Sequence, residues 1–272
     1  MSESAATRGG EASKAVYVYG IVAGDGPATM FDGVRGIDAS EPVLLVRGDG
    51  LAAVASRVPV DEFGAEAIET RLHDPVWLEQ KARAHQAVLE TALREATVLP
   101  FRFGTIYSDE AHVRAMLADH PEFRETLSRL EGKVELGVKA FLDRGVLRAR
   151  LADQRGGEAD VPASGRAYMQ RKQLERELDE RARAFAGECA RDSHDALAAA
   201  AEDGRINATQ PFAAPHADRE LLLNGAYLVP AADEQRFVAA LESLRERYGV
   251  DGVTYELTGP WPAYNFVGER DE

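Results

Sequence analysis

Cysteine is nearly absent: Cys189 is the single cysteine among 272 residues. An intrachain disulfide needs two cysteines, so a small fold held together by disulfides is excluded. Long apolar runs are also missing, and none approaches the roughly 20 residues that a membrane-spanning helix needs. Residues 1–14 are mostly small and polar and lack the apolar stretch of a signal peptide. We therefore expect a disordered tail over 1–14 and a cytoplasmic protein without a membrane partner.

Basic residues are scarce. The chain has 32 Lys and Arg against 46 Asp and Glu, which gives a formal net charge of −14. Proteins that bind a phosphate backbone or an anionic membrane surface need clustered cations. This composition excludes nucleic acid and such membranes as expected partners. Apolar residues make up 45% of the chain, enough to form a packed core.

Motifs that carry chemistry are also lacking. No two histidines or cysteines stand at a metal-ligand spacing, and the HExxH, CxxC and EF-hand patterns do not occur. The nucleophile motif GxSxG is absent. Glycines in Gly20–Gly26 follow a strand, but Pro27–Gly33 comes next instead of the helix and lysine of a phosphate-binding loop. We expect no enzymatic activity, no cofactor and no metal.

The first half of the chain alternates short strands with helices. Asp74 and Pro75 predict the start of a helix that continues to about residue 96. His85 lies on its apolar stripe, where a hydrogen-bonded core histidine is expected. Period-two patterns and turn residues predict the strands, and capping residues predict two later helices. The predicted strands are 15–21, 42–47, 51–58 and 97–103, and the later helices are 109–120 and 121–130.

Gly132 marks a boundary, after which a comparable series of elements follows. A loop is expected over 152–164, then one long helix over 164–203 that ends at Gly204. Asp233 is expected to cap a shorter helix, and 213–217 to form a turn. The predicted strands of this half are 133–141, 205–212, 221–229 and 253–257.

The two halves share one plan. The second half reads β-α-β-β-α-β, which is the ferredoxin-like topology, and the first half repeats it without the first helix. We therefore predict an α+β protein with two ferredoxin-like domains, at 15–131 and 132–272. The long helix would measure about 60 Å at 1.5 Å per residue, more than one four-stranded sheet can cover. Part of it is expected to project, or to pack on the other domain or another chain.

Two apolar segments are candidates for protein contacts. Thr258–Val267 combines two prolines with Trp261, Tyr264 and Phe266. The prolines restrict the backbone, so the segment loses little conformational entropy when it binds or packs. These rings either cover a sheet or bind a partner. The second segment places Arg102 between two phenylalanines, where it pairs with a carboxylate, stacks on a ring or serves the structure.

Six motifs occur in order and span about residues 15–267. They are Tyr17–Ile21, Val98–Ile106, Val134–Lys139, Gly165–Tyr168, Leu222–Val229 and Gly259–Tyr264. The ordered set resembles the F/L family of gas vesicle proteins, without separating the F type from the L type. The resemblance implies an accessory or minor structural protein of gas vesicle assembly, located in the cytoplasm and at the gas vesicle. The implied partners are the hydrophobic shell protein and other gas vesicle accessory proteins.

One alternative stays open from the fold alone. Tandem ferredoxin-like domains also serve as regulatory modules that bind small molecules. Such a module is expected to gain thermal stability when its ligand is added.

Overall fold

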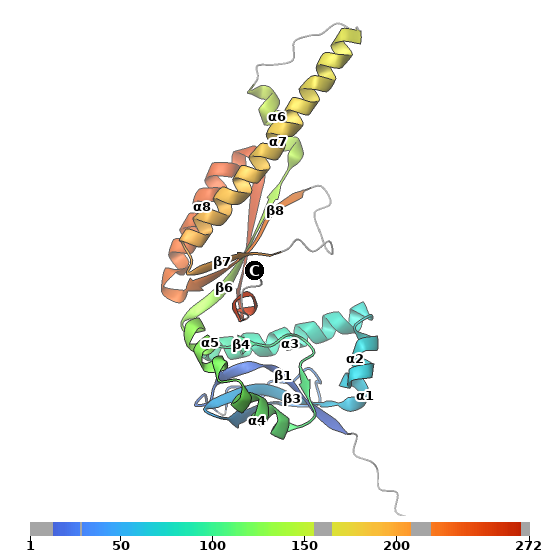
Figure 1. The fold of residues 1–272 in the computed structure, drawn as a ribbon, viewed down its shortest axis with the longest axis vertical. Coiled ribbons are helices and arrows are strands. Elements are labelled where there is room, and N and C mark those ends of the chain that lie inside the picture. Colours follow the sequence, from blue (N-terminus) through green and yellow to red (C-terminus); the bar gives the residue numbers. More distant parts are fainter. Residues whose placement is uncertain (1–12, 28, 155–164, 208–218, 268–272) are drawn as a thin grey trace, which may run out of the picture. The chain divides into compact units, whose positions relative to one another are not determined.

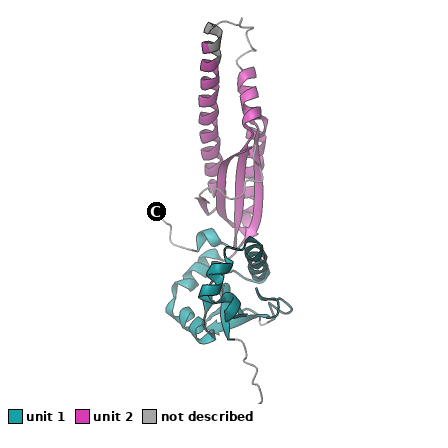
Figure 2. Cartoon of the chain, turned by 90° about the vertical axis from the view of Figure 1, so that its right-hand side faces the viewer, with its two compact units in different colours: residues 1–131, 262–272 teal, residues 132–261 magenta. Residues whose placement is uncertain are grey.

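The computed structural model describes residues 13–27, 29–154, 165–207 and 219–267, apart from the side chains of 165–168, 170 and 171 (Figure 1). By their contacts, the residues form two compact units. The first comprises 1–131 with 262–272, and the second comprises 132–261 (Figure 2). Most of the expected tail over 1–14 and of the expected loop over 152–164 lies outside the described residues. So do residues 208–212 of the strand expected over 205–212 and the whole turn expected over 213–217.

The first unit contains an antiparallel sheet in the order β2-β3-β1-β4, with β5 also paired to β1. A two-residue turn at Asp49 and Gly50 joins β2 to β3, and both residues have positive φ angles, of 51° and 70°. Such a turn matches the twist of a hairpin. The strands are β1 (Lys14–Ala23), β2 (Val43–Gly48), β3 (Leu51–Pro59), β4 (Leu99–Pro100) and β5 (Ile106–Tyr107).

Helices cover both faces of this sheet. Tyr17 and Tyr19 of β1 pack in one apolar cluster with α3, while Val18 packs in a second cluster with α4 and α5. The alternation of side chains along a strand explains why neighbouring residues of β1 enter different clusters. The helices are α1 (Val60–Phe63), α2 (Ala65–Arg71), α3 (Pro75–Glu95), α4 (Glu110–Asp119) and α5 (Glu122–Leu130).

The cap of α3 forms as the sequence predicts. The Asp74 carboxylate accepts hydrogen bonds from the backbone N–H groups of Val76 at 3.0 Å and Trp77 at 3.3 Å. Asp74→Ala is expected to lower the unfolding free energy of the first unit by about 1 kcal/mol, because it removes this acceptor. Urea unfolding followed by Trp77 fluorescence in a Trp261→Phe background would measure the loss. Asp74→Asn keeps an acceptor, and an equal loss in that variant would contradict the capping role.

The second unit contains an antiparallel sheet in the order β7-β8-β6-β9. When the strands are numbered within each unit, β6–β9 follow the order second, third, first, fourth, as β1–β4 do in the first unit. Helices α7 and α8 both contribute to the apolar cluster formed by the described residues of this unit, and they lie on one face of the sheet (Figure 1). The elements are β6 (Lys133–Leu142), α6 (Arg144–Asp153), α7 (Gly165–Ala199), β7 (Asp203–Ile206), β8 (Glu220–Pro230), α8 (Glu234–Tyr248) and β9 (Val253–Trp261).

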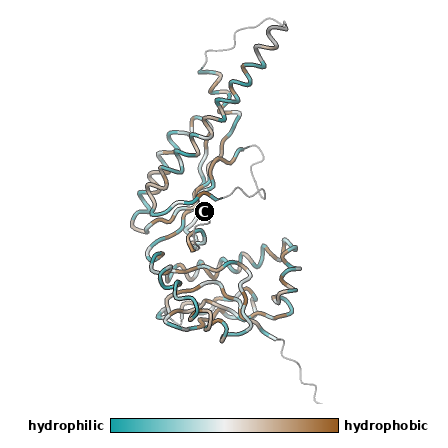
Figure 3. The backbone as a smooth tube through the Cα atoms, in the orientation of Figure 1, coloured by the Kyte–Doolittle hydropathy of each residue, from teal (hydrophilic) through white to brown (hydrophobic). Residues whose placement is uncertain are grey.

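The long helix α7 packs through its later part. Ala182, Cys189 and Leu197 are buried against the sheet and α8, whereas Met169 is 66% exposed. Within the second unit, the start of α7 extends past the end of the sheet with α6 beside it (Figures 1 and 2). Hydrophilic and hydrophobic residues alternate along the helix (Figure 3). The expected projection beyond the sheet is therefore present, and Cys189 is a buried core residue.

Several predicted boundaries were wrong. The strand expected over 97–103 is only Leu99–Pro100, because Pro100 lacks a backbone N–H and Gly104 turns the chain with a φ of 88°. The long helix ends at Ala199, and Gly204 lies inside β7. Helix α6 was not predicted, although the Asp143 carboxylate caps it by accepting from Gly145 N at 2.8 Å. Residues 262–272 were predicted in the second domain, whereas the described part of this segment, 262–267, groups with the first unit.

Candidate functional site

The candidate site is a hollow of about 340 Å³ on the first unit. It brings together two residues singled out from the sequence, Arg102 and Tyr264, which lie far apart along the chain. Helix α3 forms one wall and the segment after β4 forms another. The lining residues are Ala82, His85, Gln86, Arg102, Phe103 and Tyr264.

His85 lies under the hollow and holds the segment after β9 in place. Only 3% of its surface is exposed. Its Nδ1 lies 2.8 Å from the Tyr17 hydroxyl, and its Nε2 lies 3.0 Å from the Tyr264 hydroxyl. The Tyr17 oxygen also accepts from the backbone N–H of Gly104 at 3.1 Å. The expected hydrogen-bonded core histidine is confirmed.

These bonds fix one tautomer of His85. Among the described residues, His85 Nδ1 is the acceptor within reach of the buried Tyr17 O–H, so the hydroxyl donates to it. The single proton of a neutral imidazole then lies on Nε2, which donates to the Tyr264 oxygen. Burial lowers the pKa of His85 to about 4, outweighing a nearby backbone carbonyl of Phe101 that raises it. His85 is therefore neutral near pH 7 and orients Tyr264 without carrying charge.

The segment that carries Tyr264 is anchored at a second point. Phe266 has no exposed surface, and the Arg129 guanidinium donates a hydrogen bond to its carbonyl oxygen. Tyr264 itself is half-buried and packs at the edge of the α3 cluster. The short helical turn Tyr264–Phe266 is thus held on the first unit by one buried ring and by hydrogen bonds at two positions.

Arg102 is exposed at the rim of the hollow. Its carbonyl oxygen accepts from the Thr105 hydroxyl at 2.8 Å, which holds the turn before Gly104. A carboxylate partner, a stacked ring or a structural role was predicted for its side chain. The structure gives the guanidinium no ion pair and no stacked ring within the described part of the chain.

The other two candidate residues lie elsewhere. Phe266 is core and presents no surface for a partner. Trp261 ends β9 in the second unit, opposite Glu135, and its Nε1 donates to the Thr258 hydroxyl at 3.1 Å. Its side chain is half-buried. The aromatic segment is therefore divided between the two units. Sequence reasoning missed Gln86 and Phe103 as lining residues, since nothing in the local pattern shows which residues the fold brings next to Tyr264.

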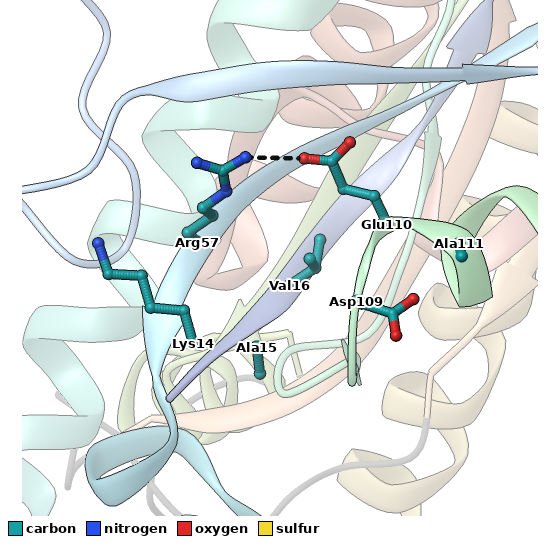
Figure 4. Close-up of a pocket in the computed structure, with 7 residues that line it drawn as sticks. All are labelled: Lys14, Ala15, Val16, Arg57, Asp109, Glu110 and Ala111. Carbon is teal, nitrogen blue, oxygen red and sulfur yellow. Dashed lines mark hydrogen bonds and ion pairs between the residues drawn. The ribbon is translucent and has the colours of Figure 1, made fainter. Parts of the chain in front are cut away.

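A second hollow on the first unit differs in charge (Figure 4). Its two cations are Arg57, which pairs with Glu110 at 3.1 Å, and Lys14, which pairs with Glu41 at 2.6 Å. The cations are already neutralised by the protein's own carboxylates. This hollow therefore lacks the unpaired cation that distinguishes the first one.

Two other kinds of site are absent from the described residues. Within the described ranges, no three His, Cys, Asp or Glu side chains are grouped so as to hold a metal ion. Of the helices described, none combines the length and apolar character needed to cross a membrane.

The sequence matches a protein family over nearly its whole length. The family model described as "Gas vesicle synthesis protein GvpL/GvpF" matches residues 15–268. The chain belongs to this GvpL/GvpF family. It is 35% identical over 258 residues to gas vesicle protein L of Streptomyces sp. (strain CB03234), covering 94% of each chain. To gas vesicle protein F of the same strain it is 33% identical, covering 92% of this chain and 98% of that one. Identity therefore does not separate the L type from the F type.

Solved structures of GvpF share the fold. The crystal structure of GvpF from Anabaena sp. PCC7120 superposes with a TM-score of 0.67 at 21% identity, covering 94% of this chain and 97% of that one. GvpF from Microcystis aeruginosa gives a TM-score of 0.63 at 22% identity, with coverage of 93% and 99%. The mixed α/β fold with antiparallel sheets is thus the fold of these GvpF structures.

Proposed function

We propose that this GvpL/GvpF protein is an accessory or minor structural protein of gas vesicle assembly that acts by binding the hydrophobic shell protein and other gas vesicle proteins. It is not an enzyme, and it works in the cytoplasm and at the gas vesicle. Family membership supports the role. The observation that carries the binding mode is the hollow of the first unit, where a half-buried Tyr264 and an exposed Arg102 meet on a fixed frame. Rigid aromatic residues beside an arginine are typical of protein contacts.

We further propose that each unit is a ferredoxin-like domain, the first one lacking its first helix. Strands β1–β4 of the first sheet and β6–β9 of the second both follow the order second, third, first, fourth, and the paired strands are antiparallel. That order supports the βαββαβ topology. The irregular connection between β1 and β2 takes the place of the missing helix.

Co-purification tests the binding role. The tagged protein is co-expressed with the hydrophobic shell protein, and the complex is washed at high salt, which weakens surface ion pairs but not apolar contacts. Retention of the shell protein is expected. Its loss from a preparation in which both proteins are soluble would contradict a direct shell contact.

The double variant Trp261→Ala and Tyr264→Ala is expected to reduce the retained shell protein by about tenfold or more, since two aromatic contacts are removed. Quantitative gel densitometry after the high-salt wash measures it. Matched controls are Leu72→Ala and Val250→Ala, which remove apolar side chains that are 44% and 57% exposed elsewhere on the two units. Undiminished retention by a folded double variant would show that these rings are only structural.

A further inference from the structure

We infer that the hollow is an acceptor site for a carboxylate, and that its occupant is an acidic side chain of a partner protein with an apolar neighbour. The inference rests on the proposed protein-binding role and specifies its chemistry. The carboxylate would meet Arg102 and Gln86, and the apolar neighbour would lie on Ala82 and Phe103.

Charge complementarity supports an anionic group. The protein carries a net charge of −14, yet the lining contains a cation and no carboxylate. In the same unit, Arg83 pairs with Glu79 at 2.6 Å and Arg57 pairs with Glu110 at 3.1 Å. Arg102 has no comparable partner among the described residues. An unpaired guanidinium beside aromatic walls thus offers an anion a local site in an otherwise acidic protein.

The N–H donors of Arg102 and Gln86 suit a carboxylate group. A guanidinium presents N–H groups in a fork that matches the two oxygens of a carboxylate. Gln86 also lines the hollow, and its amide has two N–H donors. Its Nε2 contacts Glu90 Oε1 at 3.4 Å, a long bond that leaves the amide a second N–H. Glu90 itself is not among the lining residues.

The frame around Arg102 is already ordered. The Thr105 hydroxyl bonds to its carbonyl at 2.8 Å, and Gly104 donates to the Tyr17 hydroxyl at 3.1 Å. Across the hollow, His85 fixes Tyr264 at 3.0 Å. Groups held in place before binding lose less entropy when a ligand arrives, so a single charge pair contributes more to affinity.

Hydrocinnamate, an aromatic acid with a short stem, is a suitable probe, and its neutral amide hydrocinnamamide is the control. Saturation-transfer NMR on the full chain would compare the two. We expect the acid to bind about tenfold more tightly, because a hydrogen bond to a charged group contributes more than a neutral one. Arg102→Gln is expected to remove the difference. Arg83→Gln, which changes an exposed arginine on the same helix wall outside the hollow, is expected to preserve it.

Three results would overturn the site: equal binding of acid and amide, no binding of either, or an unchanged preference in Arg102→Gln. A further experiment tests whether the occupant of the hollow is a protein side chain or a small free acid. Hydrocinnamate, but not the amide, is expected to displace co-purified shell protein. Retention of the shell protein while the acid is bound would overturn the assignment to a protein side chain. Failure of co-purification itself would count against the proposed function and leave the NMR result to decide the carboxylate site.

Discussion

Replacing Phe266 with alanine is expected to lower the unfolding free energy of the first unit by about 3–5 kcal/mol, the usual loss for a fully buried phenylalanine. The side chain has no exposed surface, although it follows the second unit in sequence. Its removal leaves a cavity and weakens the anchoring of Tyr264. Urea unfolding reported by Trp77, which is 7% exposed in the first unit, would measure the loss in a Trp261→Phe background.

The matched control for Phe266→Ala is Asn265→Ala, in the same short turn but only half-buried. It is expected to lower the unfolding free energy by about 1 kcal/mol, the central value for single substitutions, because a half-buried side chain leaves little cavity. A loss from Phe266→Ala no larger than that of the control would show that the segment does not belong to the core of the first unit.

The second large effect is a dependence of stability on pH that originates in His85. Its pKa is about 4 in the folded protein and about 6.5 when exposed. Because the folded pKa is lowered, the stabilisation is present above pH 6.5 and is lost as the pH falls toward 4. Each factor of ten in proton affinity corresponds to about 1.4 kcal/mol, so the full effect is about 3 kcal/mol, of which about 2 kcal/mol is lost between pH 7 and pH 5.

The comparison with His85→Gln isolates this effect. Glutamine keeps a donor and an acceptor but does not titrate, and the groups that face His85 are the tyrosines Tyr17, Tyr19 and Tyr264. The burial that lowers the pKa of His85 also raises the pKa values of Tyr17 and Tyr19, so these two tyrosines stay neutral throughout this range. Unfolding measured by Trp77 fluorescence at several pH values should show the wild type losing about 2 kcal/mol more than the variant between pH 7 and pH 5. Parallel curves would contradict the lowered pKa assigned to the buried His85.

Local signals in the sequence predicted most strands and the capped helix α3. The period-two pattern of β1 and the turn at Asp49 and Gly50 are properties of neighbouring residues, so they can be read without the fold. Helix α6 was missed because its ten residues contain only a short apolar pattern, even though Asp143 offered a cap. The strand at Leu99–Pro100 was overextended because the turn at Gly104 depends on the buried Tyr17 hydroxyl.

The candidate site was only partly predictable. Arg102 stood out between two phenylalanines and Tyr264 stood out in a proline-rich segment, but their meeting depends on tertiary structure. His85 was predicted as a core residue, and its contact to Tyr264 at 3.0 Å joins residues 179 positions apart. Trp261 and Phe266 looked equivalent in sequence, yet one ends a strand of the second unit and the other is fully buried in a segment that groups with the first. A local pattern cannot distinguish these outcomes, because burial is decided by distant residues.

The return of the chain to the first unit has a consequence for synthesis on the ribosome. Residues 1–131 emerge first, but their core lacks Phe266 until residues 132–261 have also been made. At about 5–20 residues per second, the nascent first unit waits on the order of ten seconds with an unfilled site in its core. During that interval its apolar surface is open to chaperones and to other nascent chains. A segment translated after the second unit therefore completes the unit that began to fold first.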